Sequence, residues 1–389
     1  MLRRFLCLFF VLECTATSTA QLPTSSSNFT LSTTHFADTI PVDFDNGLLL
    51  VPVEIEGRTY RYILDTGAAQ GMLNVPSPIP QKSCLGNVIT RDANDNADTL
   101  KAIVMPPMKL GKITIDGYVA LMGKKIIGKG NCDGILGFDL INQGISMKID
   151  VRRRQLILTD RSDFFEGEKG ERLKYHLKWF VPHVYVSPFK RHVDEVCFDT
   201  GCQQLYEMNV DAFRVHAYRS RQVNAQVEGR ATGYFSPADN SRQTAEVFFL
   251  HLNRLKWNDF ALTDVHCTTT QGSSRVGAQL LKYGSVIFNQ RQKTVTFQPY
   301  DGQDSVNVGN RQLGVAFIPR DGRPEIGIIW HKSEAFRNGM RQGDTVLSIN
   351  GTAVPNFQWF ANYQFKDGQR YVFRLRDSKG REKEVSLTR

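Results

Sequence analysis

Short apolar runs separated by turn-forming residues recur along the first 300 positions of the chain. Residues 53–55 and 62–64 flank a turn at 56–58, and a second pair of runs, at 184–186 and 196–198, flanks a longer turn. β-Branched and aromatic residues are frequent in these runs, and the apolar spacing of long amphipathic helices is scarce. Because such residues fit a pleated, partly buried surface, the pattern predicts a mostly β protein rich in hairpins.

The runs belong to an internal repeat. Each copy contains, in the same order, Val-Pro, a strand ending in Asp-Thr-Gly, a hairpin with a polar tip, an apolar-apolar-Gly triplet, a short helical segment and a closing strand pair. The triplet is weaker in the second copy, where it begins with arginine. So many landmarks in one order predict a duplicated unit. In the two copies they fall at 51–52 and 181–182, 65–67 and 199–201, 92–96 and 236–240, 135–137 and 275–277, 138–142 and 278–282, and 146–158 and 286–297.

The first 20 residues have the features of a secretory signal peptide. Two arginines precede an apolar run at 5–12, which is too short to span a membrane, and a small-residue cleavage motif follows at 18–20. Lipidation at Cys14 is the alternative, although Glu13 stands where a lipoprotein signal has a small residue. We therefore expect an exported protein, periplasmic or extracellular, with a flexible Ser/Thr-rich segment at 21–38.

Charge and hydropathy argue against other classes of protein. The net charge is +9, but the 48 basic and 39 acidic residues are spread along the chain, so we expect no nucleic-acid partner. No later stretch approaches the roughly 20 apolar residues of a membrane-spanning helix. We expect the chain to act as a monomer.

Export would permit disulfides. Because the number of cysteines remaining after signal removal is odd, at least one thiol stays outside any internal pair. Cys84 and Cys132 would close a loop within the first copy, but their spacing alone does not establish that bond. None of the spacings matches a zinc site. The cysteines are Cys84, Cys132, Cys197, Cys202 and Cys267.

The repeat places one aspartate at the same position of each copy, Asp65 and Asp199. Two carboxyl groups close enough to share a proton can divide the work of peptide hydrolysis, one acting as base on a water while the other polarises the carbonyl. Like charges at that distance cannot both ionise, so such a pair titrates in two separated steps. The adjoining threonines can hydrogen-bond between copies, and the glycines let backbone N–H groups reach the carboxylates.

Residues 40–300 resemble a single-chain, two-lobed aspartic protease of the retropepsin and pepsin type, with lobes at 39–160 and 161–300. The resemblance implies that Asp65 and Asp199 are catalytic, that the substrate is a protein or peptide, and that no metal or organic cofactor takes part. It also implies a substrate-covering flap at the hairpin tip, 91–97. The residues implied to support the catalytic loops are Thr66, Gly67, Thr200, Gly201, Gly137 and Gly277.

Two positions depart from the pepsin-like pattern, which has Ser or Thr after each Asp-Thr-Gly. This chain has Ala68 and Cys202 there. Because hydrogen-bond donors favour the ionised carboxylate, their loss should raise the pKa values of the pair. We therefore expect an activity optimum at weakly acidic or neutral pH.

The pattern changes after a linker at 301–305. A Leu-Gly-Val strand start, a small-residue helix at 333–340, Gly-Asp, an apolar run and an Asn-Gly turn at 350–351 follow in order. Together they resemble a small α+β PDZ domain of the bacterial kind over 308–389. The resemblance implies that a peptide ligand adds to a sheet edge and that its terminal carboxylate meets backbone N–H groups. The implied carboxylate loop consists of Leu313, Gly314 and Val315.

The sequence leaves two alternatives to an exported aspartic endopeptidase with a PDZ domain. A catalytically inactive protein of the same fold would bind peptides without cleaving them, although both aspartates are intact. An interaction scaffold would need only residues 308–389 for partner binding.

Overall fold

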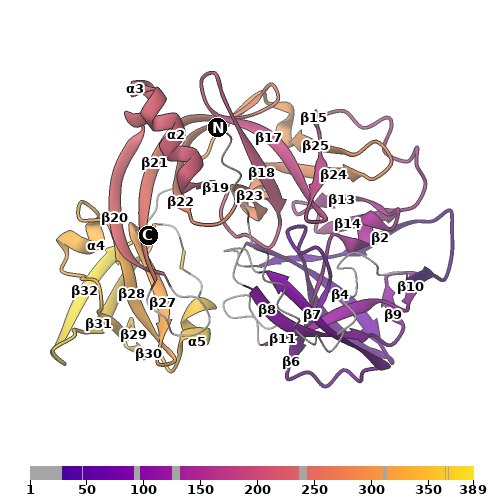
Figure 1. Cartoon of the computed structure of the whole chain (residues 1–389), viewed down its shortest axis with the longest axis horizontal. Coiled ribbons are helices and arrows are strands. Elements are labelled where there is room, and N and C mark those ends of the chain that lie inside the picture. The colour runs from indigo at the N-terminus through magenta and orange to yellow at the C-terminus, as the bar shows by residue number, and fades with distance from the viewer. Residues whose placement is uncertain are drawn as a thin grey trace, which may run out of the picture.

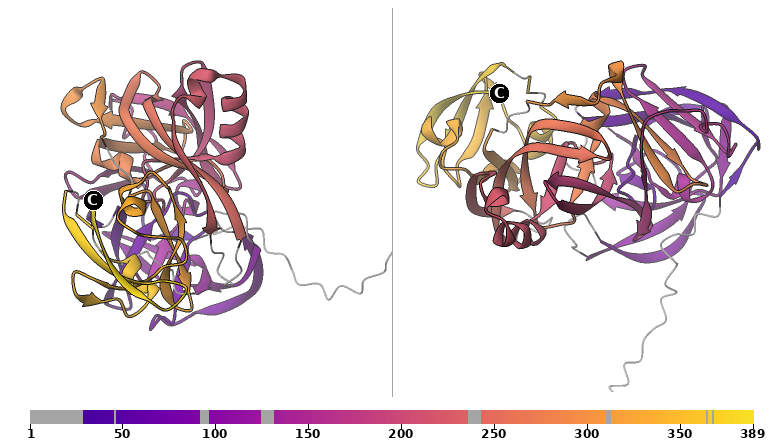
Figure 2. Two further views of the ribbon diagram at one scale, coloured as in Figure 1. Left: turned by 90° about the vertical axis from the view of Figure 1, so that its left-hand side faces the viewer. Right: turned by 90° about the horizontal axis from the view of Figure 1, so that it is seen from above.

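The computed structural model describes residues 29–45, 47–91, 97–124, 132–235, 243–309, 313–363, 365–366 and 368–389. Within these ranges the chain forms four β-sheets and short helices, which confirms the mostly β, two-lobed architecture. Figure 1 shows the first lobe at lower right, the second lobe above it and the C-terminal unit at lower left. Seen from above, the first lobe and the C-terminal unit lie at opposite ends, with the second lobe between them (Figure 2).

The first lobe is built on one large sheet with the strand order β1-β10-β9-β4-β5-β12-β6-β11-β8-β7, and β3 pairs with β4. Its central strand β12 is parallel to β5 and antiparallel to β6. The strands are β1 (Thr30–Leu31), β3 (Asp43–Asp45), β4 (Leu48–Ile55), β5 (Arg58–Leu64), β6 (Met72–Val75), β7 (Ser83–Arg91), β8 (Ala97–Val104), β9 (Met108–Leu110), β10 (Ile113–Asp116), β11 (Val119–Lys124) and β12 (Gly134–Leu136).

The second lobe repeats this arrangement, with the order β16-β17-β18-β23-β19-β22-β21-β20. Here β23 is parallel to β18 and antiparallel to β19, as β12 is to β5 and β6, so the predicted duplication is present in the topology. Helix α2 begins where the Asn209 side chain accepts the N–H groups of the first turn. The elements are β16 (His176–Lys178), β17 (Val181–Phe189), β18 (His192–Asp199), β19 (Tyr206–Asn209), α2 (Val210–Arg219), α3 (Arg221–Asn224), β20 (Val227–Phe235), β21 (Gln243–Trp257), β22 (Phe260–Thr270) and β23 (Arg275–Gly277).

A third sheet joins the lobes, with the order β15-β25-β24-β13-β14-β2. The two predicted closing strand pairs meet in it, β13 against β24. Phe288 of this sheet makes edge-to-face contacts with Phe138 and Phe198, whose ring centroids lie 5.5 and 5.2 Å away. One apolar core therefore supports both Asp-Thr-Gly loops. The strands are β2 (Ala37–Pro41), β13 (Ser146–Asp150), β14 (Gln155–Thr159), β15 (Glu171–Lys174), β24 (Gly284–Asn289) and β25 (Thr294–Pro299).

The other repeat landmarks also form. Strands β7 and β8 make the first hairpin, and β20 and β21 make the second. Of the flap expected at 91–97, residues 92–96 lie outside the described residues, as does the second hairpin tip at 236–240. The predicted short helical segments are α1 (Asp139–Asn142) and a 3₁₀ helix (Ala278–Lys282).

Part of the segment expected to be flexible is folded. Residues 30–31 pair with β10, and residues 37–38 belong to β2, which pairs with β14. Phe29 and Phe36, each 9% exposed, are buried in the core of the lobes. Ser/Thr-rich composition predicted mobility, but two aromatic side chains anchor this stretch, each worth roughly 1.5–3 kcal/mol on full burial.

The C-terminal unit has its own sheet, β27-β28-β29-β31-β32, with β30 on β29, and its own apolar core. The expected linker is partly ordered, because β26 (Ser305–Asn307) adds to β22 of the second lobe. The Ser333 side chain caps α4 by accepting the Phe336 N–H. The elements are β27 (Val315–Arg320), β28 (Arg323–Ile329), α4 (Glu334–Arg337), β29 (Thr345–Ile349), β30 (Thr352–Ala353), α5 (Phe357–Ala361), β31 (Arg370–Arg376) and β32 (Glu382–Thr388).

This unit is packed against the β20–β21 hairpin of the second lobe. The Trp330 ring stacks on Phe249 with centroids 5.5 Å apart, and Ile328 joins a small apolar cluster with Ala231. A side chain at Gly233 would approach Ile328 Cγ1 to 2.7 Å, so the close approach of β20 and β28 requires glycine at that position. The unit is therefore docked on the protein rather than only tethered to it.

Within the described ranges, no helix is both long and apolar enough to cross a membrane. The five cysteines that the structure describes are all free thiols, Cys84 and Cys132 included.

Candidate active site

The two aspartates occupy equivalent places in the lobes. Asp65 follows β5, and its N–H donates to the Leu136 carbonyl of β12, 2.9 Å away. Asp199 is the last residue of β18 and stands opposite Gly277 of β23 in parallel register. Asp65 is 6% exposed, and the Asp199 side chain is 13% exposed. The repeat thus delivers two nearly buried carboxyl groups to the lobe interface.

Reciprocal hydrogen bonds lock the two loops together. The Thr66 N–H donates to Thr200 Oγ1 at 2.9 Å, and the Thr200 N–H donates to Thr66 Oγ1 at 3.1 Å. Each hydroxyl then donates across the interface, Thr66 to the Phe198 carbonyl at 2.6 Å and Thr200 to the Leu64 carbonyl at 2.7 Å. Both threonines are fully buried, so these four bonds satisfy groups that have no access to water.

Each loop glycine lies against the aspartate of the other lobe. A side chain at Gly67 would come within 2.5 Å of Asp199 Cγ, and one at Gly201 would come within 2.5 Å of Asp65 Oδ1. The absence of a side chain at both positions is what allows the carboxyl groups to approach. Gly67 and Gly201 also donate their N–H groups to Oδ1 of their own aspartates, at 3.0 and 2.9 Å.

The apolar-apolar-Gly triplets pack directly behind the loops. A side chain at Gly137 would lie 2.8 Å from the Ala68 carbonyl oxygen, and one at Gly277 would overlap the Cys202 carbonyl oxygen. The residue after each glycine donates its backbone N–H to the same carbonyl oxygen. Phe138 donates to Ala68 at 2.8 Å, and Ala278 donates to Cys202 at 2.7 Å. The weaker triplet of the second copy therefore has the same structural role as the first.

The two departures from the pepsin-like pattern differ in effect. Ala68 supplies no side-chain donor. Cys202 donates its backbone N–H to Asp199 Oδ1 at 3.0 Å, while its sulfur lies 3.8 Å from Glu207 Oε2. Burial raises the pKa of the Cys202 thiol well above its usual value, and Glu207 and Asp199 act in the same direction. The thiol is therefore neutral at physiological pH.

The sequence analysis missed an ion-pair network beside Asp199. Arg275 Nη1 lies 3.6 Å from Asp199 Oδ2, and its Nε lies 3.1 Å from Glu207 Oε2. Burial lowers the pKa of Arg275, but Glu207 and Asp199 outweigh it and hold the pKa above its ordinary value. The sequence did contain a signal for this network, because Arg275 is a charged residue in a triplet that is otherwise apolar.

Two cavities among the described residues lie elsewhere. One of about 520 Å³ is in the second lobe near α3, and one of about 670 Å³ adjoins β4 and β14 of the first lobe. Neither is lined by Asp65 or Asp199, so the assignment of the site rests on the geometry of the loops.

The residues predicted to bind a PDZ ligand lie in the C-terminal unit. Leu313 and Gly314 precede β27, which is the edge strand of its sheet and begins at Val315. Gly314 has φ +68°, and a side chain there would come within 2.5 Å of Ser333 Cβ. The Gly314 carbonyl accepts the Trp330 N–H at 2.8 Å, so this loop is tied to the surface that contacts the second lobe.

Comparison with known proteins gives structural similarity at low identity. An aspartic proteinase from Irpex lacteus is 13% identical, covers 69% of this chain and 98% of its own, and has a TM-score of 0.46. Basic 7S globulin from soybean is 10% identical, covers 67% of this chain and 94% of its own, and has a TM-score of 0.39. No family model and no curated protein sequence matches. The mostly β, two-lobed pepsin-like fold is therefore assigned from the duplicated topology and paired loops of this chain.

Proposed function

We propose that the chain is an aspartic endopeptidase in which Asp65 and Asp199 activate a water for attack on a peptide bond. The reciprocal contact of the two loops carries the proposal, because each aspartate lies against the glycine of the other lobe. Thr66 and Thr200 fix that arrangement with four buried hydrogen bonds. Two carboxyl groups held together by equivalent loops suit chemistry that shares one proton.

In this mechanism the ionised carboxylate removes a proton from the water as its oxygen attacks the peptide carbonyl carbon. The protonated carboxyl meanwhile hydrogen-bonds the carbonyl oxygen. Breakdown of the tetrahedral intermediate breaks the C–N bond, and the carboxyl that took the proton from the water donates it to the leaving nitrogen, which returns the pair to its starting protonation state. The Arg275 guanidinium favours the ionised form of Asp199, so Asp199 serves as the base and Asp65 as the acid when substrate arrives.

Cleavage of a diverse peptide library by the purified chain, scanned from pH 3 to 8, tests the proposal. We expect hydrolysis that is lost in both Asp65→Asn and Asp199→Asn, with circular dichroism spectra unchanged. Hydrolysis that persists in either variant would reject the dyad. Peptide binding without cleavage at any pH would instead support an inactive binding protein of this fold.

We further propose that the C-terminal unit is a PDZ domain of the bacterial kind and that the protein is exported. The positive φ of Gly314 beside the edge strand β27 supports the first point, because a strand edge can accept a peptide as an added strand. The N-terminal pattern of 1–20 supports the second.

Binding of fluorescent peptides to Asp65→Asn, which cannot cleave them, tests the PDZ proposal. Peptides with a free C-terminal carboxylate should bind and their C-terminal amides should not. Equal binding of both forms would contradict carboxylate capture. For export, the N-terminal residue of the protein recovered from the producing cells should be Gln21.

A further inference from the structure

A cluster of histidines and carboxylates lies in the second lobe, apart from the Asp65 and Asp199 loops. His251 Nε2 is 2.7 Å from Asp264 Oδ1, and His266 Nδ1 is 2.8 Å from Glu228 Oε2. Asp264 Oδ1 also lies 3.5 Å from His266 Nε2. The two imidazole rings are stacked, with centroids 4.3 Å apart and an interplanar angle of 7°.

Sheet register explains why these residues meet although they are far apart in sequence. His251 of β21 stands directly opposite His266 of β22, and Asp264 lies two residues before His266 on the same strand. Residues two apart in a strand share a face, and opposed residues of antiparallel strands lie about 5 Å apart. Glu228 reaches the cluster from β20, the next strand of the sheet. Three adjacent strands thus supply the four side chains.

We propose that Glu228, His251 and His266 form a binding site for a zinc-class divalent cation, with Asp264 as an additional ligand or as a hydrogen-bond partner that orients the imidazoles. Among the described residues, one nitrogen from each histidine and one Glu228 oxygen all lie within 4.8 Å of one another. Ligands bound at about 2.0–2.2 Å from zinc stand somewhat closer together. Binding of one ion by both imidazoles would require the side chains to move closer and the two rings to tilt out of their stack, because each nitrogen lone pair lies in the plane of its ring.

The donor set favours such an ion over calcium or magnesium. Two imidazole nitrogens and a carboxylate oxygen match the ligands that zinc and related transition metals prefer, whereas the harder cations bind mainly oxygen. The two carboxylates would balance the charge of a dication. All four side chains are partly accessible, between 18 and 40% exposed, so an ion could enter without unfolding the sheet.

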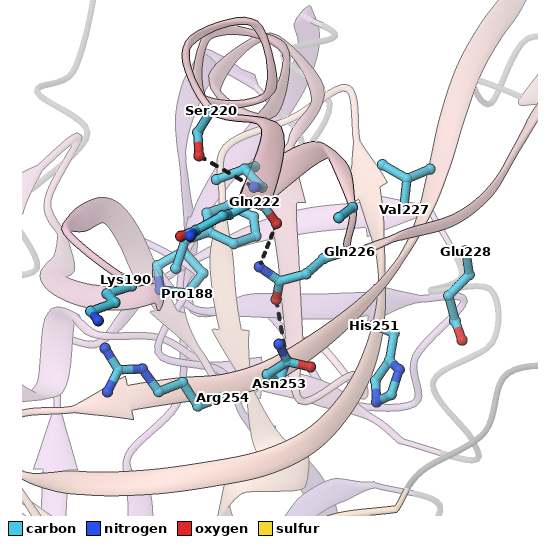
Figure 3. A pocket seen from close by; sticks show the side chains of 13 residues that line it. Pro188, Lys190, Ser220, Gln222, Gln226, Val227, Glu228, His251, Asn253 and Arg254 are labelled. Atoms are coloured by element: carbon cyan, nitrogen blue, oxygen red, sulfur yellow. Dashed lines mark hydrogen bonds between the residues drawn. The ribbon is translucent and has the colours of Figure 1, made fainter.

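One side of the cluster opens onto a cavity. Figure 3 shows the Glu228 carboxylate and the His251 ring at one end of a cavity of about 520 Å³, with Gln226 and Asn253 nearby. A three-residue site that faces open space leaves room for a water or an exchangeable ligand on the metal.

The position of the site gives metal binding a structural consequence. Glu228 immediately precedes Gly229, whose Cα faces the Trp330 indole of the C-terminal unit. An ion that ties Glu228 to β21 and β22 would fix the start of the strand on which that unit is docked.

Calorimetric titration of the untagged, EDTA-treated chain with ZnCl₂ at pH 7.5 tests the proposal. The titration uses a Cys84→Ser background, because Cys84 is an exposed thiol that could bind zinc on its own. We expect one zinc per chain and a rise in Tm with added zinc, since binding only to the folded state stabilises it. Addition of EDTA should reverse the rise.

The variants His251→Ala and His266→Ala should each lose more affinity than the roughly 10- to 100-fold that loss of an outer-shell partner costs. Glu228→Gln should also weaken binding, and it retains the shape of the side chain if the alanine variants fold poorly. The matched control is His176→Ala, which breaks another His–carboxylate contact, with Glu195 at 2.8 Å. Absence of one-to-one binding, or equal loss in the control, would overturn the proposal.

Discussion

The guanidinium of Arg275 lies 3.6 Å from the carboxylate of Asp199, and the Arg275 side chain is only 12% exposed. A cation at that distance stabilises the ionised carboxylate. Arg275 therefore favours ionisation of Asp199, whereas the missing hydroxyl donors at Ala68 and Cys202 disfavour ionisation of the pair. The dyad is therefore asymmetric, with a buried positive charge beside one aspartate.

Replacing Arg275 should change the pH dependence of catalysis. In Arg275→Met the ionised form of Asp199 loses its cation, so a higher pH is needed to form the base. We expect the acidic limb of the kcat/KM profile to move up by about 1 pH unit, at the low end of the effect of a nearby opposite charge. Profiles measured on one peptide substrate from pH 3 to 8 would show the shift.

Two controls separate charge from packing. Arg275→Lys keeps the charge and should shift the limb less. Arg275→Met with Glu207→Gln removes the partner that would otherwise be left as a partly buried, unpaired carboxylate, so it should be more stable than Arg275→Met. Because it also removes a negative charge that disfavours ionisation of Asp199, its limb should move less than that of Arg275→Met. An unmoved limb in Arg275→Met would contradict the role of Arg275.

The threonine network should contribute measurably to stability. Thr200→Val keeps the side-chain shape but leaves the Thr66 N–H and the Leu64 carbonyl without their buried partner. Urea unfolding should show a loss of about 2 kcal/mol, the cost of stranding buried polar groups. Thr200→Ser retains the hydroxyl and should lose less. A loss in Thr200→Ser as large as that in Thr200→Val would contradict the assignment of the effect to the hydrogen bonds of the hydroxyl.

Glu168 should stabilise the junction of the lobes in a pH-dependent way. Partial burial raises the pKa of Glu168, but hydrogen bonds from Gln298 and Lys148 outweigh it and lower the pKa below its ordinary value. A lowered folded-state pKa gives stability that is present above the unfolded pKa of about 4.3 and is lost as pH falls through the folded pKa.

We therefore expect Glu168→Gln to unfold more easily at pH 7, by a few tenths to about 1 kcal/mol after screening by solvent. The difference should shrink towards pH 3, as urea titrations at the two pH values would show. Glu166→Gln, which alters an exposed carboxylate in the same segment, is the control. A difference that is the same at both pH values would contradict the charge-based explanation.

Docking of the C-terminal unit should depend on Gly233. In Gly233→Val the new side chain would collide with Ile328 and separate β20 from β28. Calorimetry should then show the C-terminal unit melting apart from the second lobe, where the unaltered chain melts with the two coupled. Thr232→Val places a similar side chain at the adjacent, exposed position and should leave the profile unchanged. A single coupled transition in Gly233→Val would contradict the docked arrangement.

The sequence was sufficient for the local features of the site. The two Asp-Thr-Gly triplets and the glycines at 137 and 277 could be matched because a strand–turn–strand pattern and a need for glycine are local properties. Residues 29–38 could not be placed, because the burial of Phe29 and Phe36 depends on strands more than 70 positions away.

By itself, the order of the landmarks determined a duplicated, mostly β chain with Asp65 and Asp199 at equivalent positions. Tertiary structure alone decided that Arg275 would stand beside Asp199, that His251 would stack on His266, and that Trp330 would stack on Phe249. The reason is physical: a repeat fixes which strands are equivalent, whereas contacts between side chains depend on sheet register and packing, which distant parts of the chain set together.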